Sequence, residues 1–197
     1  YEGAMEQYQA ALKIQEQVFG KDSPITAAGY NNIGAVYYQQ REFDAALVEY
    51  RKGLDVLQKA APDHPDVASA WNNVGLSLYQ KGEFEESLEC HVKARELLET
   101  LFGKDHPHLA TTIGCIGNVL KSQDRLDEAL EEYKLAHQLL EAALGPNHAD
   151  VASSYNNMGL VLSQKGNLDD ALTVYRAAQS AFRSSMGAEH PHTASCH

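Results

Sequence analysis

The chain is poor in the features that define several common protein classes. It has only three cysteines, Cys90, Cys115 and Cys196, and their irregular spacing argues against a disulfide framework. Reduced thiols in a cytoplasmic compartment are the simpler interpretation. No apolar run is long enough to span a bilayer, and no signal-peptide pattern opens the sequence. We therefore predict a cytoplasmic protein that does not insert into membranes.

Positive charge is also scarce. The chain has 16 Lys and Arg residues against 27 Asp and Glu residues, a formal net charge of −11. Binding to nucleic acid needs a basic stripe that neutralises phosphates, and the sequence contains none. Anionic membrane surfaces are disfavoured for the same reason. The acidity favours protein or peptide partners that are neutral or basic.

Patterns that carry enzyme chemistry are missing. There is no glycine-rich phosphate loop and no nucleophile elbow, and over residues 1–191 no His/Cys pair has the i,i+3 or i,i+4 spacing of a helical metal site. We expect no enzyme activity, no cofactor and no metal. Histidine does recur once per repeat, and we interpret these residues as turn and cap residues: His64, His106, His148 and His190. An enzymatic role would require a catalytic domain outside this sequence. The region described by this sequence would then be a regulatory domain attached to that enzyme.

The sequence does contain an internal repeat. Glycines at positions 34, 75, 117 and 159 are separated by 41, 42 and 42 residues. Aromatic or leucine residues keep the same steps at positions 43, 84, 126 and 168. A fixed period of this size indicates stacked supersecondary units rather than one closed core. Such arrays usually present surface to other proteins.

Each repeat has the pattern of two amphipathic helices. Apolar residues recur every three or four positions from Asp66 to Lys81 and again from Phe84 to Phe102, and Gly82 can end the first helix at positive φ. We predict one repeat domain over residues 1–197, which is a fragment of a longer chain. Its expected parts are a leading second helix at 1–19, helix pairs at about 25–59, 66–102, 108–144 and 150–186, and the start of a further repeat at 190–197.

The order of large and small residues in each pair resembles the tetratricopeptide signature. In the second pair the signature residues are Trp71, Val74, Gly75 and Leu78, followed by Ser87, His91 and Ala94. The long period, the Asn-Asn before the glycine and the Gly-x-x-His-Pro loop are similar to the repeats of kinesin light chains. The resemblance implies an all-α, right-handed superhelical solenoid of antiparallel helix pairs that serves as a scaffold or adaptor.

In tetratricopeptide arrays, the first helices of the pairs line a concave groove that holds an extended peptide. The resemblance therefore implies a groove built from the matching positions of the first helices. The peptide-binding residues implied in this way are Asn32, Tyr38, Gln39, Asn73, Leu76, Tyr79, Gln80, Asn118, Asn157, Leu160 and Gln164.

The asparagines have two possible roles. A carboxamide can pair with both the N–H and the C=O of a peptide backbone, and similar arrays use this asparagine to bind peptides. Alternatively, it bonds a neighbouring helix and stabilises the stack. The Asn-Asn doublets suggest one role for each member. The third pair has Gly114-Cys115 instead, so we expect its part of the groove to be weaker or shaped for an apolar side chain.

Two ligand classes of similar arrays do not match this groove. The chaperone-tail clamp needs Lys or Arg four residues before the asparagine, where this chain has Ala28, Ser69, Thr111 and Ser153. Acidic peptides need a basic groove, and Lys121 alone lies near this one. Two other interactions stay open: a basic partner on the acidic second helices, and end-to-end self-association of the fragment.

Overall fold

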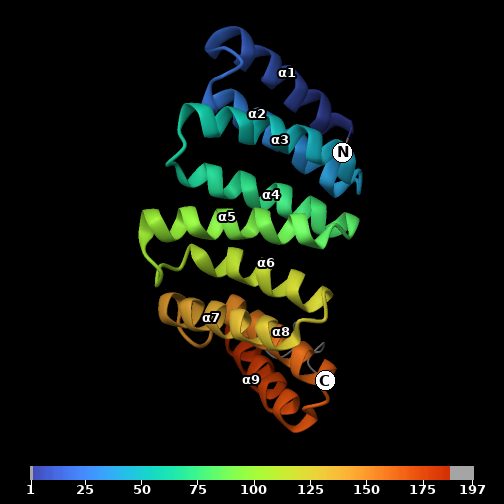
Figure 1. The fold of residues 1–197 in the computed structure, drawn as a ribbon, viewed down its shortest axis with the longest axis vertical. Helices are drawn as coiled ribbons and strands as arrows, with labels where there is room; N and C mark the ends of the chain where they lie inside the picture. The colour runs from blue at the N-terminus through green and yellow to red at the C-terminus, as the bar shows by residue number, and fades with distance from the viewer. Residues whose placement is uncertain (1, 187–197) are drawn as a thin grey trace. The chain divides into compact units, whose positions relative to one another are not determined.

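A computed structural model describes residues 2–186, and this part of the chain contains nine α-helices and no strand (Figure 1). The all-α class is therefore confirmed. The predicted start of a further repeat at 190–197 lies outside the described residues. The helices are α1 (Glu2–Phe19), α2 (Pro24–Gln39), α3 (Phe43–Ala60), α4 (Pro65–Lys81), α5 (Phe84–Phe102), α6 (Leu109–Ser122), α7 (Leu126–Leu144), α8 (Ala149–Gln164) and α9 (Leu168–Met186).

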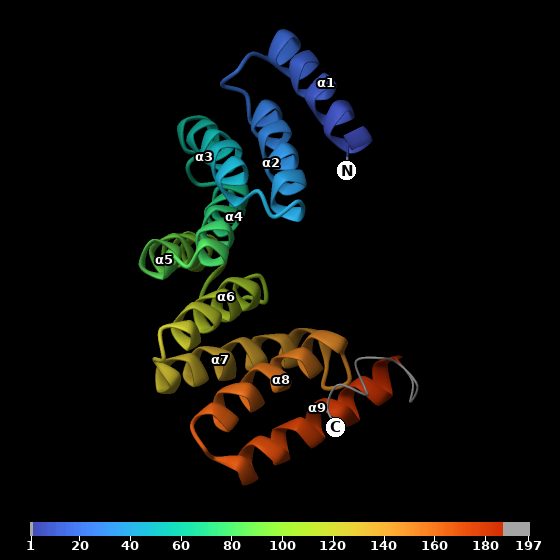
Figure 2. The ribbon, with the colours of Figure 1, turned by 90° about the vertical axis from the view of Figure 1, so that its right-hand side faces the viewer.

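The chain divides into two compact units, Tyr1–Leu101 and Phe102–His197. In the first unit α1 packs on α2, α2 on α3 and α3 on α4. In the second, α6 packs on α7, α7 on α8 and α8 on α9, and Figure 2 shows α8 and α9 lying side by side. Each unit is thus a stack of helix hairpins with a continuous apolar interior.

A ring-on-glycine contact joins the two helices of every hairpin. The repeated glycine has no side chain, so an aromatic or imidazole ring from the second helix lies directly on its backbone. A Cβ added at these glycines would come within 2.5–2.8 Å of a ring atom. The four contacts are Gly34 with Tyr50, Gly75 with His91, Gly117 with Tyr133, and Gly159 with Tyr175. The repeat therefore needs glycine here because any other residue would separate the helices.

Histidine caps two of the first helices. The Nδ1 atom of His64 accepts a hydrogen bond from the backbone N–H of Asp66 at 3.2 Å, and His148 accepts one from Asp150 at the same distance. The predicted cap role of these two residues is confirmed. His106 accepts from the backbone N–H of His108 at 3.3 Å, although α6 begins only at Leu109. His190 lies outside the described residues.

The turn inside each hairpin requires a left-handed backbone conformation. Gly82 has φ +81° and ends α4, as predicted, and Gly166 has φ +81° at the matching place after α8. The corresponding residues of the other two hairpins are Arg41 at φ +64° and Asp124 at φ +60°. These two are not glycine, so their turns carry backbone strain that the residue type does not reveal.

Two glycines of α6 are expected to respond oppositely to alanine. Gly117→Ala places a methyl group 2.7 Å from the Tyr133 ring and should lower the free energy of unfolding by about 1–3 kcal/mol. Gly114→Ala has no atom within 4 Å of the new Cβ and should raise that free energy by roughly 0.5–1 kcal/mol, because alanine loses less backbone entropy in a helix. Urea denaturation of both variants checks this. Destabilisation by both alanines would contradict the packing described here.

Candidate functional site

The first helices of each unit carry a recess on the side that the sequence assigned to the groove. We call this side, formed by α2 and α4 in the first unit and by α6 and α8 in the second, the first-helix face. The recess of the first unit has a volume of about 160 Å³. Its lining residues are Ala35, Tyr38, Gln39, Tyr50, Asn73 and Leu76. The predicted residues Tyr38, Gln39, Asn73 and Leu76 therefore lie together.

Aromatic and amide contacts fix the rim of this first recess. The Tyr38 ring meets Phe43 at 5.5 Å between centroids in an edge-to-face arrangement. The Gln80 side-chain amide donates a hydrogen bond to the Tyr38 hydroxyl at 3.1 Å, which links α4 to α2. Tyr79 lies one residue away, with its ring 5.7 Å from Phe84. Tyr38 is thus held from two sides.

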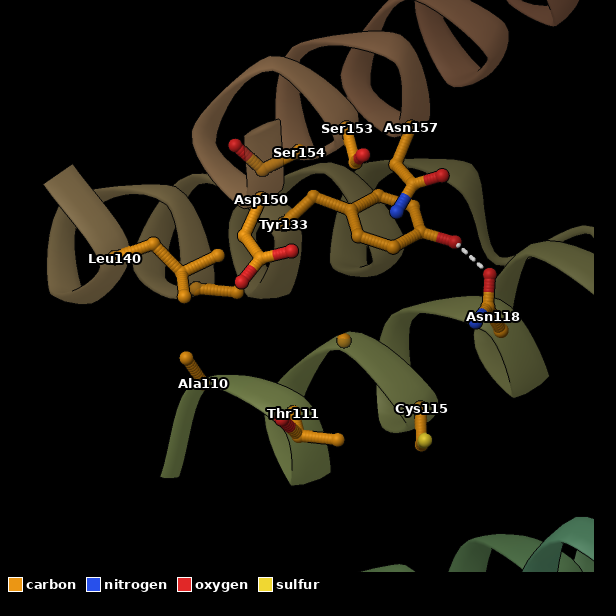
Figure 3. Close-up of a pocket in the computed structure, with 12 residues that line it drawn as sticks. Ala110, Thr111, Cys115, Asn118, Tyr133, Leu140, Asp150, Ser153, Ser154 and Asn157 are labelled. Carbon is orange, nitrogen blue, oxygen red and sulfur yellow. Dashed lines mark hydrogen bonds between the residues drawn. The ribbon is translucent and has the colours of Figure 1, made fainter. Parts of the chain in front are cut away.

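The recess of the second unit is larger, about 330 Å³, and lies among α6, α7 and α8 (Figure 3). Its wall includes the Tyr133 ring, whose hydroxyl donates to the Asn118 Oδ1 atom at 2.7 Å. The lining residues are Ala110, Thr111, Gly114, Cys115, Asn118, Tyr133, Ala136, Leu140, Asp150, Ser153, Ser154 and Asn157. The predicted residues Asn118 and Asn157 therefore lie on the same recess.

The departure from Asn-Asn in the third pair is what opens this recess. Gly114 has no heavy atom within 4 Å of the position a Cβ would take, and Cys115 has a smaller side chain than asparagine. We expected this part of the groove to be weaker or shaped for an apolar side chain. The recess is the larger of the two on the first-helix faces, with an apolar side at Ala110, Ala136 and Leu140 and polar groups around it.

The two members of each asparagine doublet have different surroundings. The first members turn toward their own hairpin: the Asn72 Oδ1 atom is 2.8 Å from the His91 Nδ1 atom, and the buried Asn31 Oδ1 atom lies against Gly53. The second members, Asn73 and Asn157, line the recesses, and among the described residues no hydrogen-bond partner meets either side-chain amide.

The remaining predicted residues lie outside the recess linings. Asn32 is exposed, and Leu160 is 48% exposed. The Gln164 side-chain amide donates to the Asp124 carboxylate at 3.2 Å, so it connects α8 to the turn before α7. Pattern reasoning missed the contributions of Tyr50, Tyr133 and Leu140 because it followed the first helices alone. It also missed Asp150, which lies two helical turns before Asn157.

Burial shifts the pKa of Cys115, which lines the second recess, and of His91, which packs on Gly75. It raises the pKa of the Cys115 thiol to about 11, so the thiol stays protonated at neutral pH and is a poor nucleophile. Burial lowers the pKa of His91 to about 4, and the His91 Nε2 atom has no hydrogen-bond partner. Within residues 2–186 no cluster of three potential metal ligands occurs, and no helix is long and apolar enough to cross a membrane.

The stacked hairpins and their two recesses define the chain as a helical-repeat protein. The tetratricopeptide repeat family model matches residues 1–59, 66–114, 109–184 and 150–197, so the chain belongs to the tetratricopeptide repeat family. No curated protein sequence matches significantly.

Several solved structures share the fold. BtubC (BKLC) from P. vanneervenii superimposes with a TM-score of 0.79 at 15% identity, covering 99% of this chain and 87% of that one. Nearly identical TPR-like repeats described as kinesin light chain from Podosopora anserina give 0.78 at 12% identity, covering 92% and 86%. A Rap protein complexed with Competence and Sporulation Factor gives 0.77 at 17% identity, covering 91% and 48%.

The buried His91 should make stability depend on pH. Its pKa is about 4 in the folded chain against about 6.5 when unfolded, so protons bind preferentially to the unfolded state between these values. The free energy of unfolding should therefore fall as pH decreases from about 6.5 to about 4, by on the order of 3 kcal/mol from this residue. Urea denaturation at pH 7.5 and pH 5 measures the change.

His91→Tyr is the matched variant, because tyrosine occupies this position in the other three hairpins. It should reduce the difference between the two pH values. An unchanged difference would show that His91 does not cause the acid sensitivity.

Proposed function

We propose that the chain is a cytoplasmic, non-enzymatic scaffold or adaptor module whose first-helix faces hold an extended peptide segment of a partner. The observation that supports this most directly is the pair of recesses, each lined by the second asparagine of a doublet with an amide available to a ligand. A free carboxamide beside an apolar wall suits an extended peptide, whose backbone alternates donors and acceptors and whose side chains point to both sides.

The charge of the chain supports a neutral or basic partner. The net charge of −11 disfavours acidic peptides, and no Lys, Arg or His side chain lines either recess. Tyr38 and Leu76 offer apolar contact beside Asn73, and Leu160 offers it on α8. A Rap protein of similar fold has been solved in complex with Competence and Sporulation Factor, which supports a binding role for this kind of repeat array.

The two recess asparagines can be tested together. Peptides of twelve random residues would be selected by display on the wild-type chain and their affinities measured by fluorescence polarisation. Asn73→Ala combined with Asn157→Ala should weaken binding about tenfold, because each amide contributes about 0.5–1.5 kcal/mol through hydrogen bonds to the peptide backbone.

Asn147→Ala, in the exposed loop before α8, is the matched control and should leave the affinity unchanged. Circular dichroism establishes that all variants are equally folded. Equal affinities for the double variant and the wild type would overturn the proposed role of these asparagines.

Self-association is a second candidate function, favoured by exposed apolar residues on α1 and α9. Val18 is 66% exposed, Phe19 53%, Leu168 66% and Leu172 49%. If these faces join copies end to end, light scattering should show a mass that rises with concentration and falls to the monomer in Val18→Lys and Leu168→Lys. A concentration-independent monomeric mass of the wild type would exclude this candidate.

A further inference from the structure

One charged side chain lines the recess of the second unit. Of the twelve lining residues only Asp150 is ionisable to a charge at neutral pH, and it comes from the first turn of α8. Figure 3 shows its carboxylate projecting from α8 toward α6, beside Leu140. The recess of the first unit has no charged lining residue, so the two recesses differ in chemistry.

No described cation neutralises this carboxylate. The His148 Nδ1 atom is 3.5 Å from the Asp150 carboxylate, but the same nitrogen accepts the hydrogen bond from the Asp150 backbone N–H. A nitrogen that accepts a hydrogen bond carries no proton, so the pair has no ionic attraction in this arrangement. The Asp150 side chain is 64% exposed, so its carboxylate is open to a ligand from outside the chain.

An apolar side of the recess leads to the carboxylate. Ala110 on α6 and Ala136 and Leu140 on α7 lie on this side, and Gly114 leaves the space between α6 and α8 open. A purely apolar side chain in this space would cover Asp150 without pairing it, which costs free energy, and an acidic one would be repelled. A long aliphatic stem that ends in a positive charge matches both surfaces.

We infer that the recess of the second unit binds a cationic side chain, arginine or lysine, of the partner peptide. The methylene stem lies against Ala110, Ala136 and Leu140, and the terminal group pairs with Asp150. The volume of about 330 Å³ is at the lower end of the roughly 300–1,000 Å³ typical of ligand pockets. The inference rests on the proposed peptide-binding function and adds which side chain one part of the peptide must carry.

The test uses small probes, so it does not depend on having a peptide ligand. N-acetyl-arginine methylamide, its lysine and tryptophan analogues and the uncharged isostere N-acetyl-citrulline methylamide would each be titrated into the isotope-labelled chain at low salt. Amide signals of Ala110–Asn118 report on the recess. We expect the arginine and lysine probes to shift these signals at concentrations about threefold to fivefold lower than citrulline or tryptophan, the gain of an exposed ion pair.

Two variants locate the effect. Asp150→Asn should remove the preference for cations. Gly114→Asn should abolish binding of every probe, because it fills the space with the residue that the other three hairpins carry at this position. Asp66→Asn is the matched control: Asp66 occupies the same place on α4, next to a histidine cap, and outside the recess of its own unit. It should change nothing.

Equal shifts by arginine and citrulline, stronger binding of tryptophan, or a cation preference that survives Asp150→Asn would each overturn the inference. The proposed function is tested separately, by the affinities of the display-selected peptides for the wild-type chain and the asparagine variant. If those peptides depend on Asn73 and Asn157 but the probes show no cation preference, the groove function stands and the inference is wrong. If the probes bind as expected but no peptide depends on these asparagines, the proposed function is wrong.

Discussion

The contact between a ring and a glycine is the constraint on which the rest of the structure depends. A ring from the second helix occupies the space where a Cβ of the first helix would be, so the two helices of each hairpin approach at a fixed depth and orientation. The ring then determines what lies next to it. The hydroxyl of Tyr133 reaches the Asn118 amide, whereas the shorter His91 is 2.8 Å from Asn72. The residue type of the ring thus determines which asparagine of the first helix it contacts.

The members of an asparagine doublet face different surroundings. Asn72 faces its hairpin interior, whereas Asn73 and Asn157 line the recesses. In α6 the doublet is replaced by Gly114-Cys115, so an interior amide and an outward amide are lost together and volume appears in their place. The recess of the second unit is consequently the larger of the two, about 330 Å³ against about 160 Å³.

Much of the fold could be predicted from the sequence because the same packing residues recur in every repeat. Four glycines at a constant step predict four close helix contacts, and the histidine before each proline or alanine predicts a helix start. The recess of the second unit was harder to anticipate, because a missing side chain gives no pattern. Asp150 and Leu140 belong to different helices 10 positions apart in sequence, and their approach depends on how α7 packs on α8. The strain at Arg41 is likewise invisible in its residue type.

The turn at Asp124 shows what a non-glycine residue can achieve at a glycine position. Glycine would adopt φ +60° freely, while aspartate does so at a cost of about 1 kcal/mol. The Asp124 carboxylate, which glycine lacks, also accepts a hydrogen bond from the Gln164 side-chain amide, 40 residues away. The turn thereby couples its own conformation to the far end of α8. The turn therefore connects successive hairpins in addition to reversing the chain. The spacing of α6 and α8 is fixed by this contact at their ends as well as by packing in the core.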